Sequence, residues 1–187
     1  MIIIGITGTL GAGKGTIVDY LVNQRGFIHF SVREFIIKEI RRRDWKVDRD
    51  QMVIVANELR ATHSPSYIVD CLYQEALESG KSCVIESIRT PGEIFSLRDK
   101  GKFILIAVDA IPELRFKRIL LRNSETDKVS YDTFIADEMR EMDSDDPNKQ
   151  NLRRCIELAD YTIQNNSSIE ELIQNVANLL EEVITSF

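Results

Sequence analysis

A glycine-rich stretch near the start of the chain carries residue types that bind phosphate. It reads Gly-Thr-Leu-Gly-Ala-Gly-Lys-Gly-Thr over residues 8–16, after an apolar run and before apolar residues at helical spacing. Glycine permits a positive φ, so successive N–H groups of this loop can point inward at a helix N-terminus, where the helix dipole favours an anion. Lys14 supplies a cation for the β and γ phosphates of a nucleoside triphosphate, and the Thr16 hydroxyl can bind Mg²⁺. The predicted nucleotide-binding residues here are Gly8, Leu10, Gly11, Ala12, Gly13, Lys14, Gly15, Thr16 and Ile17.

A carboxylate and an arginine in the middle of the chain are the next candidates, because phosphoryl transfer depends on positioning and charge neutralisation. Glu86 lies near the end of an apolar run at residues 82–88, and Arg89 follows that run directly. In an open parallel sheet, ligands bind at the carboxyl ends of the strands. Glu86 is therefore a candidate to orient water bound to Mg²⁺, and Arg89 is a candidate to reach a phosphate.

Four more arginines stand at positions from which they could meet the same ligand. Arg33 lies in the first turn of a helix predicted over residues 31–43, and Arg60 lies on a later helix; a solvated surface role remains open for both. Arg118 and Arg122 are four residues apart, so they share one face of the helix that follows the fourth predicted strand.

A polar, acid-rich stretch at residues 122–151 interrupts the pattern of the chain. Apolar residues at helical spacing within it predict a helical insertion. The insertion is either a solvated surface helix or, over about residues 122–146, a lid that closes over the reaction and excludes water. Arg140 lies inside this stretch, where neighbouring carboxylates are expected to pair with it along the helix.

Apolar runs alternate with helical stretches along the whole chain, which is typical of a parallel sheet covered by helices. The runs that predict strands are residues 2–7, 27–30, 82–88, 102–109 and 161–164. Ser31 and Thr90, each followed three residues later by Glu, predict capped helix starts, and Asp146 before Pro147 predicts another. We therefore expect an α/β protein with a single domain over residues 1–187.

The amino-acid composition excludes several classes of protein that this chain could otherwise belong to. The chain has 187 residues, a net charge of −6 and 43% apolar residues, as expected of one globular domain. The negative charge argues against a nucleic-acid partner, because duplex binding draws on clustered Lys and Arg. The three cysteines lack C-x-x-C spacing and predict reduced thiols, and the apolar start is too short for a signal peptide or a membrane span. A cytoplasmic protein that binds small molecules and no membrane is expected.

The Lys-Gly-Thr order at residues 14–16 resembles the loop of adenylate-kinase-type nucleoside monophosphate kinases, in which the threonine after Lys-Gly binds magnesium. Residues 86–90 resemble the Asp-Gly-Phe-Pro-Arg-Thr stretch of adenylate kinases, with Glu86 and Arg89 at the matching acid and arginine. Here Glu replaces Asp, and Gly-Phe-Pro is missing. The chain as a whole is similar to the P-loop nucleoside monophosphate kinase superfamily. Within that superfamily it most resembles deoxynucleoside monophosphate kinases of phage type and the kinase-like module ahead of some deoxycytidylate deaminases.

This resemblance implies a three-layer α/β/α fold with a five-stranded parallel sheet in the order 2-3-1-4-5 and a short helical lid. It also implies that helices within about residues 31–80 bind the acceptor. Arg118 and Arg122 correspond to hinge arginines that bridge donor and acceptor phosphates, and Asn165 lies in the loop that touches adenine. The acceptor phosphate is expected to be gripped by Arg33, Arg60 and Arg89.

The predicted activity is transfer of the γ-phosphoryl group of ATP, as its Mg²⁺ complex, to a (deoxy)nucleoside monophosphate. A phosphate monoester has a second pKa of about 6 and is already ionised at neutral pH, so no general base is needed. Two alternatives stay open: a kinase for dephospho-coenzyme A or a nucleoside, with Glu86 as the base for a hydroxyl acceptor, and a regulatory ATPase without acceptor chemistry. The sequence leaves open the acceptor's base and sugar, and whether the protein is a monomer or a homodimer.

Overall fold

The computed structural model describes residues 1–122 and 129–185. At its centre lies a five-stranded parallel sheet in the order β2-β3-β1-β4-β5, which confirms the predicted fold class and strand order. The strands are β1 (Ile3–Gly8), β2 (Ile28–Ser31), β3 (Cys83–Glu86), β4 (Phe103–Asp109) and β5 (Tyr161–Gln164). All except β3 begin and end within one residue of the apolar run that predicts them.

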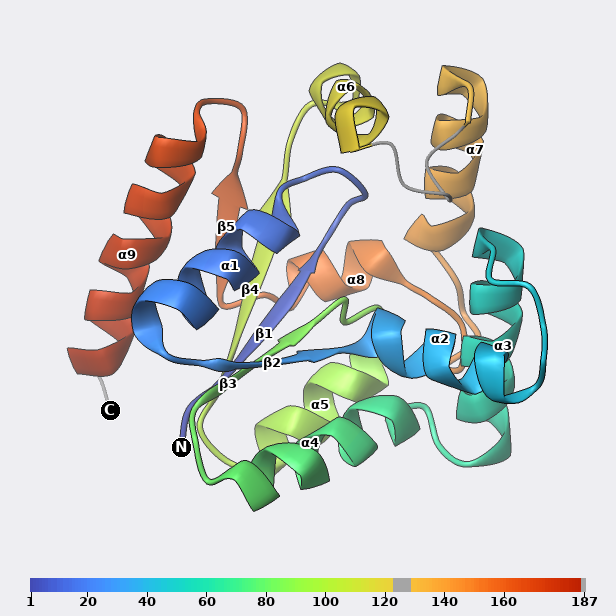
Figure 1. Cartoon of the computed structure of the whole chain (residues 1–187), viewed down its shortest axis with the longest axis horizontal. Helices are drawn as coiled ribbons and strands as arrows, with labels where there is room; N and C mark the ends of the chain where they lie inside the picture. The colour runs from blue at the N-terminus through green and yellow to red at the C-terminus, as the bar shows by residue number, and fades with distance from the viewer. Residues whose placement is uncertain (123–128, 186–187) are drawn as a thin grey trace.

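Helices cover both faces of this sheet (Figure 1), with α1 and α9 on one face and α4, α5 and α8 on the other. Within residues 1–122 and 129–185, no helix has both the length and the apolar character needed to cross a membrane. The helices are α1 (Lys14–Arg25), α2 (Val32–Arg42), α3 (Arg49–Thr62), α4 (Tyr67–Ser79), α5 (Pro91–Asp99), α6 (Pro112–Arg122), α7 (Tyr131–Met142), α8 (Leu152–Glu157) and α9 (Ile169–Thr185).

Each buried strand supplies side chains to two apolar cores. Ile4 and Ile6 of β1 pack in the core formed with α1 and α9, whereas Ile3 packs in the core formed with α2, α3, α4 and α5. Successive residues of a strand point to opposite faces, so a continuous apolar run fits a strand that is covered on both sides. Cys83 and Cys155 are buried in the core that contains Ile3, and both are free thiols, as predicted.

Two capping residues start helices directly after strands and so bring helix N-termini to the same edge of the sheet. Ser31 accepts a hydrogen bond from the N–H of Glu34 at the start of α2. At the start of α5, Thr90 accepts from the N–H of Glu93, and the Glu93 carboxylate accepts from the N–H of Thr90. Both starts agree with the sequence pattern.

The structure corrects two predicted boundaries. β3 ends at Glu86 rather than at residue 88, because Ser87 has a φ of 71° and leaves the extended conformation. The predicted helix start at Asp146 is wrong. The Asp146 carboxylate accepts from the N–H of Asn148 in a turn, and α8 starts later, behind the side-chain cap of Asn151.

The predicted lid contains α7, which packs on α6 and α8. Phe134 anchors α7; it is 1% exposed, and its ring centroid lies 5.6 Å from that of Phe116 on α6. Figure 1 places α6 and α7 beyond the carboxyl ends of the strands, with α2 and α3 to the side. Residues 123–128 of the predicted lid lie outside the described residues, and closure of this segment over a ligand stays a prediction.

Candidate active site

The glycine-rich loop joins β1 to α1, and two of its glycines have backbone conformations and close contacts that disfavour any residue with a side chain. Gly8 and Gly13 have φ values of 132° and 109°. A Cβ on Gly8 would lie 1.9 Å from the carbonyl oxygen of Val108, and one on Gly13 would lie 2.3 Å from Nδ2 of Asn165. Gly13 is also the N-cap of α1. The N–H groups of the first helical turn have no carbonyl partner within the helix, so they can serve an anion in front of the loop.

Lys14, the first residue of α1, is buried beside the loop. Its Nζ donates to the carbonyl oxygens of Gly8 and Thr9, at 3.0 and 2.7 Å. Burial, and after it the nearby Arg89, lower the pKa of Lys14 to about 7. A phosphate oxygen that replaced these carbonyl groups would stabilise the charged ammonium and raise this pKa again.

The other predicted loop residues divide between a cavity and the core. The side chains of Ala12 and Ile17 pack in the apolar core with α1 and α9, so they can touch a nucleotide only through their backbone. A Cβ on Gly15 would meet no described atom within 4 Å. The loop residues that line the cavity are Leu10, Gly11, Gly13, Lys14, Gly15 and Thr16.

This cavity has a volume of about 450 Å³ and lies where the loop meets α2, α3, α6, α7 and the segment after β3. Its volume is in the range of small-molecule sites. Glu86 and Glu141 are the carboxylates among its described lining residues, so cations are in clear excess. Such an arrangement favours a polyanion. The cations that line it are Lys14, Arg33, Arg49, Arg60, Arg89, Arg118 and Arg122.

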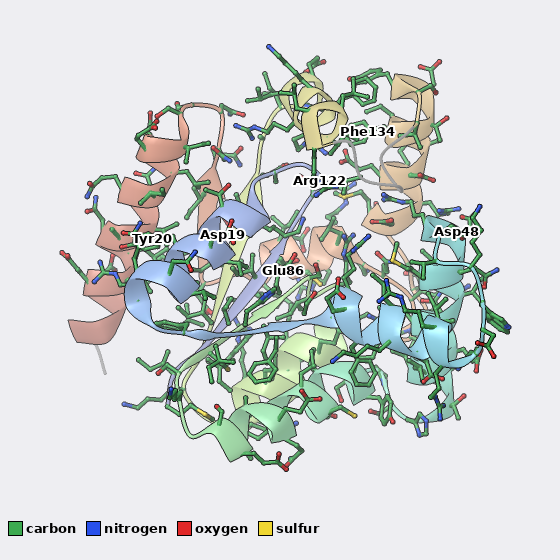
Figure 2. All side chains as sticks on the ribbon, viewed as in Figure 1. Asp19, Tyr20, Asp48, Glu86, Arg122 and Phe134 are labelled. Atoms are coloured by element: carbon green, nitrogen blue, oxygen red, sulfur yellow. The ribbon has the colours of Figure 1, made fainter. Side chains whose placement is uncertain are left out.

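Glu86 ends β3 and lies near the centre of the molecule in Figure 2. Its Oε2 is 3.3 Å from Nε2 of His29, and its Oε1 accepts from the Ser87 hydroxyl at 2.9 Å. Burial raises the pKa of Glu86, but His29, Lys14 and Ser87 outweigh it and lower the pKa to about 2. Glu86 is thus a stable carboxylate at neutral pH and a weak proton acceptor. Sequence reasoning missed His29, which no motif marks.

Arg118 and Arg122 both reach the cavity from α6, and Figure 2 shows Arg122 at the end of that helix. Nη2 of Arg118 is 3.5 Å from Oδ1 of Asn165, whereas Nη1 is buried with no hydrogen-bond partner among the described residues. Burial lowers the pKa of Arg118. Nδ2 of Asn165 donates to the carbonyl oxygen of Ala12 at 2.7 Å, so Asn165 also braces the loop.

Arg60 and Arg33 line the same cavity from α3 and α2 but differ in their surroundings. Arg60 is 1% exposed and donates from Nε and Nη2 to Oε1 of Glu93, at 3.2 and 2.8 Å. Its Nη1 is buried without a partner among the described residues. The side chain of Arg33 is 43% exposed, and its Nη1 lies 3.6 Å from Oε1 of Glu34. Arg60 is therefore partly occupied by a structural ion pair, whereas Arg33 is largely solvated.

The sequence interpretation missed two charged residues that line the cavity, Arg49 and Glu141. Arg49, the first residue of α3, donates from Nη2 to Oε1 of Glu141 at 2.5 Å. Glu141 also accepts a hydrogen bond from Arg89. Glu141 belongs to the acid-rich stretch around α7 and carries no pattern that separates it from its solvated neighbours. Its burial follows only from how α7 docks.

Two arginines outside the predicted set hold the surroundings of the cavity together. Arg115 is 2% exposed, donates to the carbonyl oxygens of Leu10 and Ala110, and pairs with Glu138 of α7. It therefore connects the tip of the loop with α7. Arg140 pairs with Asp137 on the same helix, as the sequence predicts, and with a second carboxylate on α3.

Comparison with known proteins identifies relatives that span nearly the whole chain. A family model described as an AAA domain matches residues 4–146. A UPF0200 protein of Methanococcus vannielii is 30% identical over 98% of this chain and 97% of its own length.

Solved structures share the fold at low sequence identity. A gluconokinase from Sinorhizobium meliloti aligns with a TM-score of 0.58 and 11% identity, covering 99% of this chain and 97% of that one. A shikimate kinase from Bacteroides thetaiotaomicron aligns with a TM-score of 0.54 and 15% identity, covering 96% of this chain and 98% of that one. Together with the glycine loop and the strand order, these matches show that the chain belongs to the UPF0200 proteins and to the AAA-domain family and has a P-loop NTPase α/β fold.

Proposed function

We propose that this protein is a phosphotransferase that moves the γ-phosphoryl group of ATP, as its Mg²⁺ complex, to a small acceptor that carries a phosphate. A (deoxy)nucleoside monophosphate is the first candidate for the acceptor. One observation carries the proposal: the glycine loop with Lys14 shares a single cavity with arginines from α2, α3, α6 and the segment after β3. Two phosphorylated ligands brought together need this distribution of cations.

On the donor side, the loop N–H groups, Lys14 and Arg118 are proposed to bind the triphosphate. Lys14 would exchange its two carbonyl partners for phosphate oxygens, and Nη1 of Arg118 has no partner among the described residues to give up. Arg122 enters the cavity one helical turn further along α6. Buried donors held in place in this way can stabilise the charge that builds up between donor and acceptor.

Thr16 and Glu86 are the residues that would hold Mg²⁺. Their oxygen atoms suit this ion, and the surroundings of Glu86 lower its pKa to about 2, which keeps the carboxylate ionised. The described residues contain no group of three or more His, Cys, Asp or Glu side chains arranged for a metal. A site with one carboxylate, completed by water and substrate phosphates, is common for Mg²⁺. When bound, Mg²⁺ would neutralise charge on the β and γ phosphates.

On the acceptor side, the cavity combines cations with an apolar wall. Arg33, Arg60 and Arg89 are proposed to bind the acceptor phosphate. The organic part of the acceptor can pack against the wall between α2 and α3, which consists of Val32, Ile36, Met52, Val53 and Ala56.

The low pKa of Glu86 favours a phosphate acceptor over a hydroxyl acceptor. An ionised phosphate oxygen attacks without losing a proton, whereas a hydroxyl needs a base near the operating pH. Glu86, with a pKa of about 2, is too weak a base for that task in this arrangement.

The proposal is tested by measuring ADP release with ribo- and deoxynucleoside monophosphates, nucleosides and dephospho-coenzyme A as acceptors. We expect release to require an acceptor and to be fastest with a monophosphate. Release at the same rate without any acceptor would instead identify an ATPase. Lys14→Met should lower kcat at least about a hundredfold, because it removes a transition-state donor. Lys81→Met, at an exposed lysine away from the cavity, is the matched control and should stay within about twofold of the wild-type protein.

A further inference from the structure

The acid-rich helix α7 places one carboxylate inside the cavity. Glu141 has a side chain that is only 8% exposed, and it lines the cavity together with Arg49 and Arg89. One carboxylate oxygen accepts from Arg49 at 2.5 Å, and the other accepts from Arg89. The two arginines come from different elements, α3 and the segment after β3, and both bind this carboxylate.

The charge at this point is not balanced by Glu141 alone. The Glu141 carboxylate faces two guanidinium groups, and Asp137 of the same helix supplies a second negative charge 3.3 Å from Nε of Arg49. Oε1 of Gln150 also accepts from Nη1 of Arg89 at 3.3 Å. A third guanidinium, that of Arg60, is 1% exposed and lines the same cavity. Its Nη1 has no hydrogen-bond partner among the described residues. A buried N–H donor without an acceptor is costly, so its presence points to a ligand with more acceptor atoms than Glu141 supplies.

We propose that Arg49 joins Arg33, Arg60 and Arg89 in binding the acceptor's anionic group, and that the Glu141 carboxylate occupies Arg49 and Arg89 until a phosphate monoester replaces it. The inference rests on the proposed function and deepens it by naming the residues that select the acceptor's phosphate. A monoester brings a charge of about −1.5 to −2 at neutral pH and three acceptor oxygens, against the single charge of a carboxylate. A neutral hydroxyl compound brings neither and does not displace Glu141.

This exchange also means that Glu141 selects among ligands by their charge. A ligand that binds Arg49 and Arg89 must first compete with a carboxylate that is already in place, so weakly charged ligands are rejected. Once Glu141 has been displaced, α7 keeps its other attachments, the Glu138 pair with Arg115 and the buried Phe134. Glu141 therefore acts on acceptor binding and not on the docking of α7 as a whole.

The experiment measures binding of phenyl phosphate by calorimetry, with the glycine loop saturated by the non-hydrolysable ATP analogue AMP-PNP and Mg²⁺. Glu141→Gln keeps the shape of the side chain and removes its charge. We expect the variant to bind phenyl phosphate at least about tenfold more tightly than the wild-type protein. Benzyl alcohol, which has a similar ring and no phosphate, should bind to neither.

Glu138→Gln is the matched control, because it removes another carboxylate–arginine pair of α7 outside the cavity. Its affinity for phenyl phosphate should stay within about twofold of wild type. An equal gain in Glu138→Gln and Glu141→Gln would mean that loosening α7 is sufficient, and would overturn the proposal. Unchanged or weaker binding by Glu141→Gln, or no binding of phenyl phosphate to any of the proteins, would overturn it as well.

Failure of the proposed function remains distinguishable from failure of this inference. A wild-type protein that does not bind AMP-PNP contradicts the phosphotransferase, whereas normal AMP-PNP binding with no response to Glu141→Gln contradicts only the anion site. If Glu141→Gln does not fold, the Arg49→Gln variant tests the anion site instead. It must weaken phenyl phosphate binding at least about tenfold, and unchanged affinity in a folded variant would overturn the site.

Discussion

At the scale of single residues, the surroundings of each ionisable side chain set its pKa and therefore its charge in the site. Lys14 is buried and Glu86 is half-buried at the carboxyl edge of the sheet, and their pKa values move for different reasons. Burial dominates at Lys14 and lowers its pKa to about 7, toward the neutral amine. At Glu86, His29 and Lys14 outweigh burial and hold the carboxylate ionised. The ligand-free site therefore holds a stable negative charge beside a positive charge that is only half developed at neutral pH.

The first prediction concerns the pH dependence of ATP binding. A bound triphosphate stabilises the Lys14 ammonium, so the complex prefers the protonated form while the free protein loses this proton at a pKa of about 7. Binding then takes up a proton above that pH, and affinity for ATP with saturating Mg²⁺ should fall as the pH rises from about 7 to 8.5, by up to about tenfold per unit. Calorimetric titrations measure this slope.

Lys14→Arg provides the control for this slope, because a guanidinium stays protonated throughout the range. Its affinity, whatever its absolute value, should be independent of pH above 7. A wild-type affinity that is equally flat would show that Lys14 is fully charged in the free protein.

At the scale of elements, α7 docks through a few specific contacts despite its acidic composition. Phe134 packs on Phe116 and lies beneath the Arg115 guanidinium, whose carbon is 5.4 Å from the ring centroid. Arg115 in turn reaches the loop at Leu10 and pairs with Glu138. Tyr131 of α7 also packs on Phe116, with ring centroids 5.2 Å apart. Two aromatic side chains and a few ion pairs thus connect the insertion with the surroundings of the nucleotide loop, and much of the helix can remain polar.

The second prediction tests this attachment. Phe134→Ala should cost about 3 kcal/mol of docking free energy, because a fully buried aromatic ring is lost from a small interface. Amide hydrogen exchange in α7 should become about a hundredfold faster, while β1 and β4 keep their protection. Met139→Ala, on the same helix at a side chain that is 72% exposed, should leave exchange unchanged. Equal exchange in both variants would mean that Phe134 does not anchor the helix.

At the scale of the whole molecule, the strand order assembles the site. β1 lies between β3 and β4, so the glycine loop at its end lies beside Glu86 and the segment that carries Arg89. The helices that follow β2 and β4 then enclose this edge from two sides (Figure 1). A parallel sheet gathers the carboxyl ends of its strands at one edge, and residues far apart in the sequence share one cavity there.

The third prediction follows from the closeness of β1 to β4. Gly8→Ala would place a Cβ 1.9 Å from the carbonyl oxygen of Val108, a backbone atom that cannot move without disturbing the sheet. We expect a loss of more than about 4 kcal/mol in the free energy of unfolding, or no folding at all. Gly15→Ala, where a Cβ would meet no described atom within 4 Å, should unfold at the same or a slightly higher temperature. Thermal unfolding of both variants checks this, and a stable Gly8→Ala protein would contradict the expected clash.

Much of the fold was predictable because it depends on neighbours in the sequence. The glycine loop, the apolar strands and the caps at Ser31 and Thr90 each depend on residue types within a few positions. The predicted order 2-3-1-4-5 also agrees with the structure, but it came from the resemblance to a known family and not from residue types within a few positions. Boundaries failed where a single residue adopts an unexpected local conformation, as Ser87 and Asp146 do.

The sequence by itself thus determined the strands, the helix starts and a loop suited to phosphate, because backbone conformation follows local pattern. Only the tertiary structure decided which charges meet. Arg49 and Glu141 are 92 residues apart, His29 and Glu86 are 57 apart, and both pairs join elements that no periodicity connects. An ion pair depends on where two side chains end in space, and that position exists only once the helices have packed on the sheet.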